Sequence, residues 1–124
     1  MQPNRRQFVR LRTRLTTVFK IVKTGKVRRG LTRDVSGGGL CFVSEELLAP
    51  GTSLGIELKL PDRNTPITFS AEVVWSRPVG EPPKSYEAPT IETGVKFVAV
   101  DSKNVAILRQ YATLNAHHPE PKDT

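Results

Sequence analysis

The sequence predicts a mainly β protein, a six-stranded antiparallel β-barrel followed by one C-terminal α-helix. Six short segments, most with apolar residues at alternate positions, lie between turn-forming links, and one late segment carries a helical apolar stripe. At 124 residues the chain is long enough for one hydrophobic core and too short for two. Closure into a barrel removes exposed strand edges, which favours a barrel over an open sheet.

The six strands are expected at residues 15–23, 26–35, 40–43, 54–60, 67–76 and 91–97. The fourth and fifth alternate most clearly, and the turn-forming residues 61–64 join them as a hairpin. Thr24-Gly25 provides the turn between the first two strands. Residues 78–89 contain Pro82-Pro83 and Gly80, which predicts a long, exposed and mobile loop before the last strand.

The helix is expected to begin at Asp101 or Ser102 as its N-cap and to end before His117-His118-Pro119. A broad apolar stripe should pack on the sheet or cover an open barrel end. The stripe consists of Val105, Ile107, Leu108, Tyr111, Ala112 and Leu114. The domain organisation is then a flexible basic arm at 1–14, the barrel and helix at 15–116, and a disordered tail at 117–124.

The charge distribution predicts an anionic partner. The net charge is +7 and the pI is near 10.0. Eleven basic residues precede the first acidic residue, Asp34. No apolar run approaches the ~20 residues of a membrane span, so membrane insertion is not expected. The single cysteine, Cys41, excludes an internal disulfide and fits a reducing cytoplasm.

A first chemical cluster lies in the basic arm, where Arg5 and Arg6 are followed by Arg10. In an extended arm, Arg6 and Arg10 lie on one face because they are four residues apart. Guanidinium groups bind phosphate oxygens or the O6/N7 edge of guanine with two parallel hydrogen bonds, and they stack on purines. The arm is therefore a candidate site for a guanine nucleotide.

A second cluster runs from Asp34 through Ser36 to the glycines at 37–39. The Asp34 carboxylate can accept hydrogen bonds from guanine N1–H and N2–H₂, and Ser36 can bond a phosphate or a base edge. Gly38 and Gly39 allow backbone N–H groups to approach an anion closely. Alone, such a segment is more typical of a hairpin turn, and it gains weight from its occurrence together with the arginine cluster.

Trp75 allows two interpretations. It continues the alternation of buried residues in the strand at 67–76, which predicts a buried side chain. Its place at the strand end, next to the proline-rich loop, also leaves room for stacking on a ligand.

These motifs resemble those of the PilZ domain family, bacterial receptors for cyclic di-GMP. Arg6 and Arg10 match the Arg-x-x-x-Arg motif of that family, with Arg5 as an additional arginine. Asp34, Ser36 and Gly39 match its Asp-x-Ser-x-x-Gly motif. The resemblance covers nearly the whole chain and implies the six-stranded barrel with its helix. Val73-Val74-Trp75 resembles the strand end at which some members place a ligand-contacting tryptophan.

The resemblance implies a cytoplasmic bacterial receptor that binds cyclic di-GMP without a cofactor. The expected ligand-binding residues are Arg5, Arg6, Arg10, Asp34, Ser36, Gly38, Gly39 and Trp75. Ligand binding would order the arm and change the surface presented to a downstream effector protein, in a monomer or in a dimer whose formation depends on ligand.

Two alternatives belong to other functional classes. A barrel that binds single-stranded nucleic acid would explain the basic charge, but the aromatic content of 6% is low for stacking platforms. A protein–protein adaptor could retain both motifs without binding the nucleotide. An enzyme is not expected, because the sequence shows no paired carboxylates, no phosphate-binding loop before a helix and no metal-ligand spacing.

Overall fold

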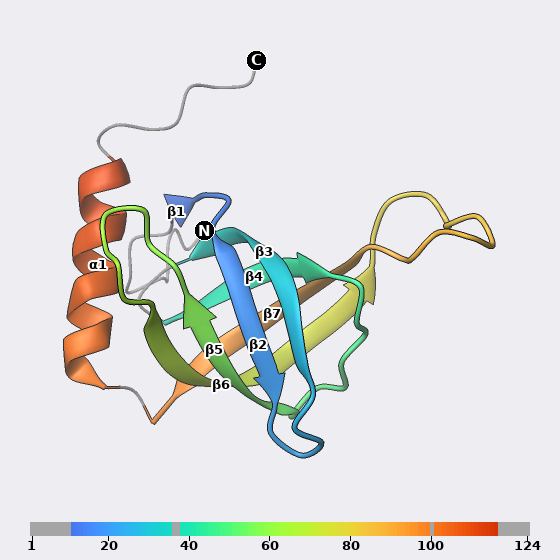
Figure 1. Ribbon diagram of the computed structural model, residues 1–124, viewed down its shortest axis with the longest axis horizontal. Helices are drawn as coiled ribbons and strands as arrows, with labels where there is room; N and C mark the ends of the chain where they lie inside the picture. Colours follow the sequence, from blue (N-terminus) through green and yellow to red (C-terminus); the bar gives the residue numbers. More distant parts are fainter. Residues whose placement is uncertain (1–10, 36–37, 100, 117–124) are drawn as a thin grey trace, which may run out of the picture.

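The computed structural model describes residues 11–35, 38–99 and 101–116, and it contains the expected closed antiparallel barrel (Figure 1). Six strands pair in the order β3-β2-β5-β6-β7-β4, and β4 pairs back with β3 to close the ring. They are β2 (Thr16–Ile21), β3 (Val27–Val35), β4 (Gly39–Ser44), β5 (Ser53–Leu58), β6 (Ile67–Pro78) and β7 (Ile91–Val98).

A seventh strand was not expected from the sequence. β1 (Leu11–Arg12) pairs with the end of β3 outside the ring, so that Leu11 lies opposite Val35 and Arg12 opposite Asp34. The Thr13 N–H extends this pairing by donating to the Arg33 carbonyl at 3.0 Å. The expected flexible arm and disordered tail fall mainly on residues 1–10 and 117–124, outside the described ranges.

The core fills the barrel with side chains from alternate positions of each strand. On β5, for example, Leu54, Ile56 and Leu58 are buried, as the period of two predicts. Two aromatic pairs also lie in the core. The ring centroids of Phe19 and Phe42 lie 4.9 Å apart, and those of Phe69 and Phe97 lie 4.1 Å apart in a stacked arrangement.

Two register shifts interrupt the alternation on the side of the barrel that carries the predicted motifs. One lies between Thr32 and Asp34 in the pairing of β3 with β4. The other lies between Val73 and Trp75 in the pairing of β6 with β7. A bulge adds one residue to one strand and so reverses the facing of every side chain beyond it. The expectation that Trp75 is buried is therefore wrong, because its side chain is 37% exposed on the outer face.

Helix α1 (Ser102–Ala116) covers one end of the barrel, where it packs against β1 and β6 (Figure 1). Asp101 is its N-cap, since its Oδ1 accepts the Lys103 N–H at 2.8 Å. Leu108 and Ala112 are fully buried, whereas Leu114 is 57% exposed, so the apolar stripe is narrower than the sequence predicts.

The link between β6 and β7 is exposed along residues 80–90 and projects from the barrel at the end opposite α1 (Figure 1). Its expected exposure is confirmed, and its mobility stays a prediction. Within the three described ranges, no helix has the length and apolar character needed to cross a membrane.

Candidate functional site

Strand pairing brings Asp34 and Trp75 to one outer face of the barrel. Asp34 lies opposite Cys41, Cys41 opposite Gly94, and Gly94 opposite Trp75, so the four residues form one row across β3, β4, β7 and β6. Neighbouring strands are about 4.8 Å apart, and the row is therefore about 14 Å long. We call the outer face of these four strands around this row the Asp34–Trp75 wall.

β1, which lies near the C-terminal end of the predicted arm, is next to the Asp34 end of this wall. Because Arg12 pairs with Asp34, the first described residues of the chain lie beside the predicted carboxylate. Arg10 is the next residue toward the N-terminus. Arg6 is five residues from Leu11, which an extended chain spans in about 17 Å. The chain between Leu11 and Arg6 is thus long enough to span the wall.

Trp75 lies flat on the wall because the residue opposite it has no side chain. A Cβ on Gly94 would lie 2.5 Å from both Cε2 and Nε1 of the indole, far inside van der Waals contact. The Arg77 guanidinium lies 4.9 Å from the indole centroid, within the range of a cation–π interaction. The wall therefore offers a half-exposed aromatic ring with a cation beside it.

Glu92 holds two of the cations of this face in place. Its Oε2 lies 3.3 Å from Arg33 Nη1, and its Oε1 lies 3.5 Å from Arg77 Nη2. The Glu92 side chain is only 14% exposed, whereas those of Arg33 and Arg77 are 49% and 67% exposed. The two guanidinium groups are thus positioned by a largely buried carboxylate while part of each remains accessible to a ligand.

Gly38 and Gly39 attach the predicted turn to β7. The Gly38 carbonyl accepts the Phe97 N–H at 2.9 Å, and Gly39 pairs with Lys96. A Cβ on Gly39 would lie 2.2 Å from the Val95 carbonyl oxygen, so only glycine permits this approach of the two backbones. The glycine is required by barrel packing, whatever else it contributes.

Cys41 lies between Asp34 and Gly94 in the row, and its side chain is buried. Burial, together with the nearby carboxylates of Glu92 and Asp34, raises the pKa of the Cys41 thiol to about 12. A thiol with this pKa is protonated at neutral pH, which makes it a poor nucleophile.

The described part of the wall is close to electrically balanced. Its cations are Arg33, Arg77 and Lys96, and its carboxylates are Asp34, Glu72 and Glu92. Lys96 Nζ lies 3.6 Å from Glu72 Oε1 on the neighbouring strand. An anionic ligand consequently needs further positive charge, and the predicted source is the arm.

The predicted site residues fall into two groups. Asp34, Gly39 and Trp75 lie on the wall, and Gly38 directly precedes it, so strand pairing brings together residues that are far apart in the sequence. Arg5, Arg6, Arg10 and Ser36 lie outside the described residues. Sequence reasoning did not identify Glu92, Gly94 or Arg77. A glycine within the alternating segment at 91–97 was a usable signal of close approach, but nothing in the sequence pairs Glu92 with two arginines.

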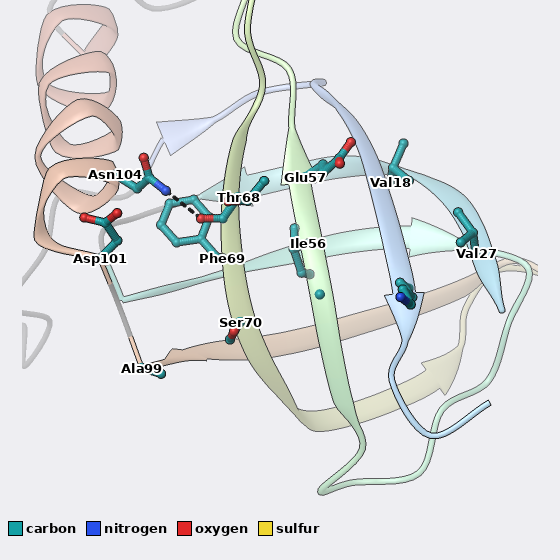
Figure 2. A pocket seen from close by; sticks show the side chains of 12 residues that line it. Val18, Val27, Ile56, Glu57, Thr68, Phe69, Ser70, Ala99, Asp101 and Asn104 are labelled. Atoms are coloured by element: carbon teal, nitrogen blue, oxygen red, sulfur yellow. Dashed lines mark hydrogen bonds between the residues drawn. The ribbon is translucent and has the colours of Figure 1, made fainter. Parts of the chain in front are cut away.

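A groove lies on a different part of the barrel. It has a volume of about 480 Å³, crosses β2, β5 and β6 and reaches the start of α1 (Figure 2). Asn104 Nδ2 donates to the Thr68 carbonyl at 2.8 Å at its helix end. None of the predicted site residues lines this groove. In the described ranges no group of three or more His, Cys, Asp or Glu side chains could hold a metal ion.

Comparisons with known proteins agree with this architecture. The family model of the PilZ domain matches residues 4–114. The PilZ domain of YcgR from Escherichia coli, solved with c-di-GMP, has a TM-score of 0.72 at 17% identity and covers 93% of this chain and 94% of that chain. A comparison with curated protein sequences finds no match.

Two longer proteins share the same fold. The Bacillus subtilis inhibitor of motility (MotI/DgrA) has a TM-score of 0.70 at 22% identity, covering 98% of this chain and 56% of that one. MrkH of K. pneumonia, in its c-di-GMP complex, has a TM-score of 0.66 at 13% identity, covering 93% and 55%. This chain therefore spans a little over half the length of each, and at these identities the likeness shows the fold.

Proposed function

Because the chain belongs to the PilZ domain family, we propose that it is a receptor for cyclic di-GMP that uses the Asp34–Trp75 wall and the arginine arm. The observation that carries the proposal is the row of paired residues that places Asp34 and Trp75 on one outer face. The structures of YcgR and MrkH with c-di-GMP support the choice of ligand.

Each end of the wall suits one part of the nucleotide. The Asp34 carboxylate complements the N1–H and N2–H₂ donors of a guanine, which other bases do not present together. The partly exposed indole of Trp75 offers a surface on which a base can stack, a contact worth about 1–3 kcal/mol. A ligand with two guanines can engage both ends of the row at once.

The arm supplies the charge that the wall lacks. The two phosphates of cyclic di-GMP carry two negative charges, and the described wall has as many carboxylates as cations. Arg6 and Arg10 would contribute two guanidinium groups, each able to form paired hydrogen bonds with a phosphate or a guanine edge. Arg5 and Ser36 are the remaining proposed contacts.

Binding would also change the surface of the protein. When Arg6 and Arg10 contact nucleotide on the wall, the arm is held against β3, β4 and β7, and the outer face of these strands is covered. Nucleotide binding would thus order the arm, and a downstream effector protein that binds only one of the two states, covered or uncovered, would respond to the nucleotide.

Isothermal titration of the full chain with cyclic di-GMP tests the proposal, with GTP and a short single-stranded oligonucleotide as comparison ligands. We expect saturable binding of the cyclic dinucleotide alone. Arg6→Ala and Arg10→Ala should each weaken binding about tenfold or more, which corresponds to a loss of ~1.4 kcal/mol. Arg63→Ala is the matched control, since it removes an exposed arginine from the turn before β6.

Three results would overturn the proposal. A flat titration with all three ligands would favour a protein adaptor, and affinity for the oligonucleotide with a steep salt dependence would favour a nucleic-acid barrel. Cyclic di-GMP binding that is equally weakened by Arg63→Ala and Arg6→Ala would show attraction to net charge rather than a site.

A further inference from the structure

The β2–β3 hairpin carries aliphatic and cationic side chains side by side on its outer face. Val27 lies opposite Lys20, and Val18 lies opposite Arg29. Val22 follows Lys20 by two residues and so continues the same face. Val22 and Val27 are 57% and 54% exposed, although valine is usually buried. They make an apolar tip surrounded by positive charge.

Most of the cations of this hairpin form no ion pair within the described part of the barrel. Arg28, the one that points to the other side, pairs with Glu46 at 3.4 Å. Arg33, at the far end of β3, pairs with Glu92. Among the described residues, no carboxylate forms an ion pair with the other four basic residues of the hairpin. These are Lys20, Lys23, Lys26 and Arg29, which with Val18, Val22 and Val27 we call the hairpin patch.

The tip is held in one conformation by its own hydrogen bonds. The Ile21 carbonyl accepts the N–H groups of Gly25 and Thr24 at 2.7 Å and 3.2 Å. The Ile21 N–H donates to the Lys26 carbonyl at 2.8 Å, and Gly25 has the positive φ of 78° that the turn requires. The valines and lysines are therefore presented together without a large ordering cost on binding.

The composition of the patch distinguishes between two kinds of anionic partner. Protein interfaces are enriched in aromatic residues and arginine and depleted of lysine. The patch has three lysines and no aromatic residue. Lysine stems lie along apolar surface while their ammonium groups reach anionic headgroups, and a polybasic surface gains affinity for anionic lipids with every charge. These features favour a lipid surface.

We propose that the hairpin patch attaches the protein to the surface of an anionic phospholipid membrane. The lysines contact the headgroups, and Val22 and Val27 enter the headgroup layer. This attachment requires no membrane-spanning segment. The patch ends at β5, where the carboxylate residue Glu57 lies opposite Val18. Asp101 lines the far end of the same groove, at the start of α1 (Figure 2).

Lipid and nucleotide would occupy different ends of the same strand. Val27 begins β3, and Asp34 lies seven residues further along it, a distance of about 23 Å. The hairpin patch and the Asp34–Trp75 wall can therefore be occupied simultaneously, and this proposal does not depend on the identity of the nucleotide.

Vesicle co-sedimentation of the full chain tests the proposal, with vesicles of phosphatidylcholine alone and of phosphatidylcholine mixed with phosphatidylglycerol. The variant Lys20→Gln/Lys23→Gln/Lys26→Gln should bind the anionic vesicles about 100-fold more weakly, at about fivefold or ~1 kcal/mol for each lysine. The matched control Lys59→Gln/Lys84→Gln/Lys103→Gln removes the same charge from exposed positions elsewhere and leaves the arm unchanged. It should bind nearly as well as the unmodified protein.

An environment-sensitive dye on Thr24→Cys locates the contact, and Cys41→Ala in the same variant removes the only native thiol. Its emission should shift to the blue on anionic vesicles, whereas a dye on Lys84→Cys should not respond. Equal loss of binding in both lysine variants would overturn the proposal by assigning the attraction to net charge. A Thr24 dye that responds to polyglutamate but not to vesicles would overturn it in favour of an acidic protein surface.

Discussion

Gly94→Ala tests how the Asp34–Trp75 wall is built. The new Cβ would lie 2.5 Å from the nearest indole atoms of Trp75, whereas ordinary contacts begin at 3.4 Å, so the ring must move by about 0.9 Å. Overpacking of this kind costs about 1–3 kcal/mol, and the partial exposure of the ring lets it tilt outward. We therefore expect the free energy of unfolding to fall by about 1–2 kcal/mol.

Trp75 is the only tryptophan, so its fluorescence reports the displacement directly. Urea unfolding followed by emission gives both the stability and the environment of the ring, which should become more polar in the variant. Gly55→Ala is the matched control, because it also lies on the outer face of a barrel strand and no atom lies within 4 Å of its Cβ. It should be neutral or stabilising by about 0.5–1 kcal/mol. Equal stability of the two variants, with unchanged emission maxima, would refute the geometry described for the wall.

Three further predictions concern other parts of the barrel. Gly39→Ala places a Cβ 2.2 Å from the Val95 carbonyl oxygen, a backbone atom that cannot move aside. Thermal melting should show that the free energy of unfolding falls by more than about 3 kcal/mol, or that no folded protein forms. A melting curve like that of the unmodified chain would contradict this. Folding raises the pKa of the Cys41 thiol from 9.0 to about 12, so as the pH rises the unfolded chain loses its thiol proton before the folded chain does. The free energy of unfolding should therefore fall between pH 9 and 12, by at most ~1.4 kcal/mol per pH unit. Urea unfolding of Cys41→Ala should lack this component. Asp101→Ala removes the cap of α1 and should cost about 1 kcal/mol by chemical denaturation, whereas Ser102→Ala should change stability by less than about 0.5 kcal/mol.

The regular part of the fold could be predicted because it follows from the period of side chains. The six barrel strands and the helix begin and end within a few residues of the predicted bounds, since alternation and capping are properties of local sequence. β1 could not be predicted, because two residues carry no period. Its position is set by pairing with the end of β3.

The geometry of the site depends on a bulge and on strand register, which the alternation of apolar residues does not predict. Asp34 and the glycines were recognised from their motif, but the outward direction of Trp75 follows from a bulge that has no sequence signal here. Glu92 and Arg77 meet because β6 and β7 pair in one register, and each alone is an ordinary surface charge. Their roles could be seen only once the strands were paired.

The closure of the barrel also determines when a binding surface exists during folding. Cys41 and Gly94 are neighbours in the row although 53 positions separate them in the chain, and this pairing of β4 with β7 is among the contacts of longest sequence separation. Hairpins such as β5–β6 can form without it, but the row of four strands cannot. A molecule that binds to this row recognises only chains that have completed closure. Its main kinetic effect is to slow the opening of the barrel, while the rate at which the barrel closes remains a property of the chain alone.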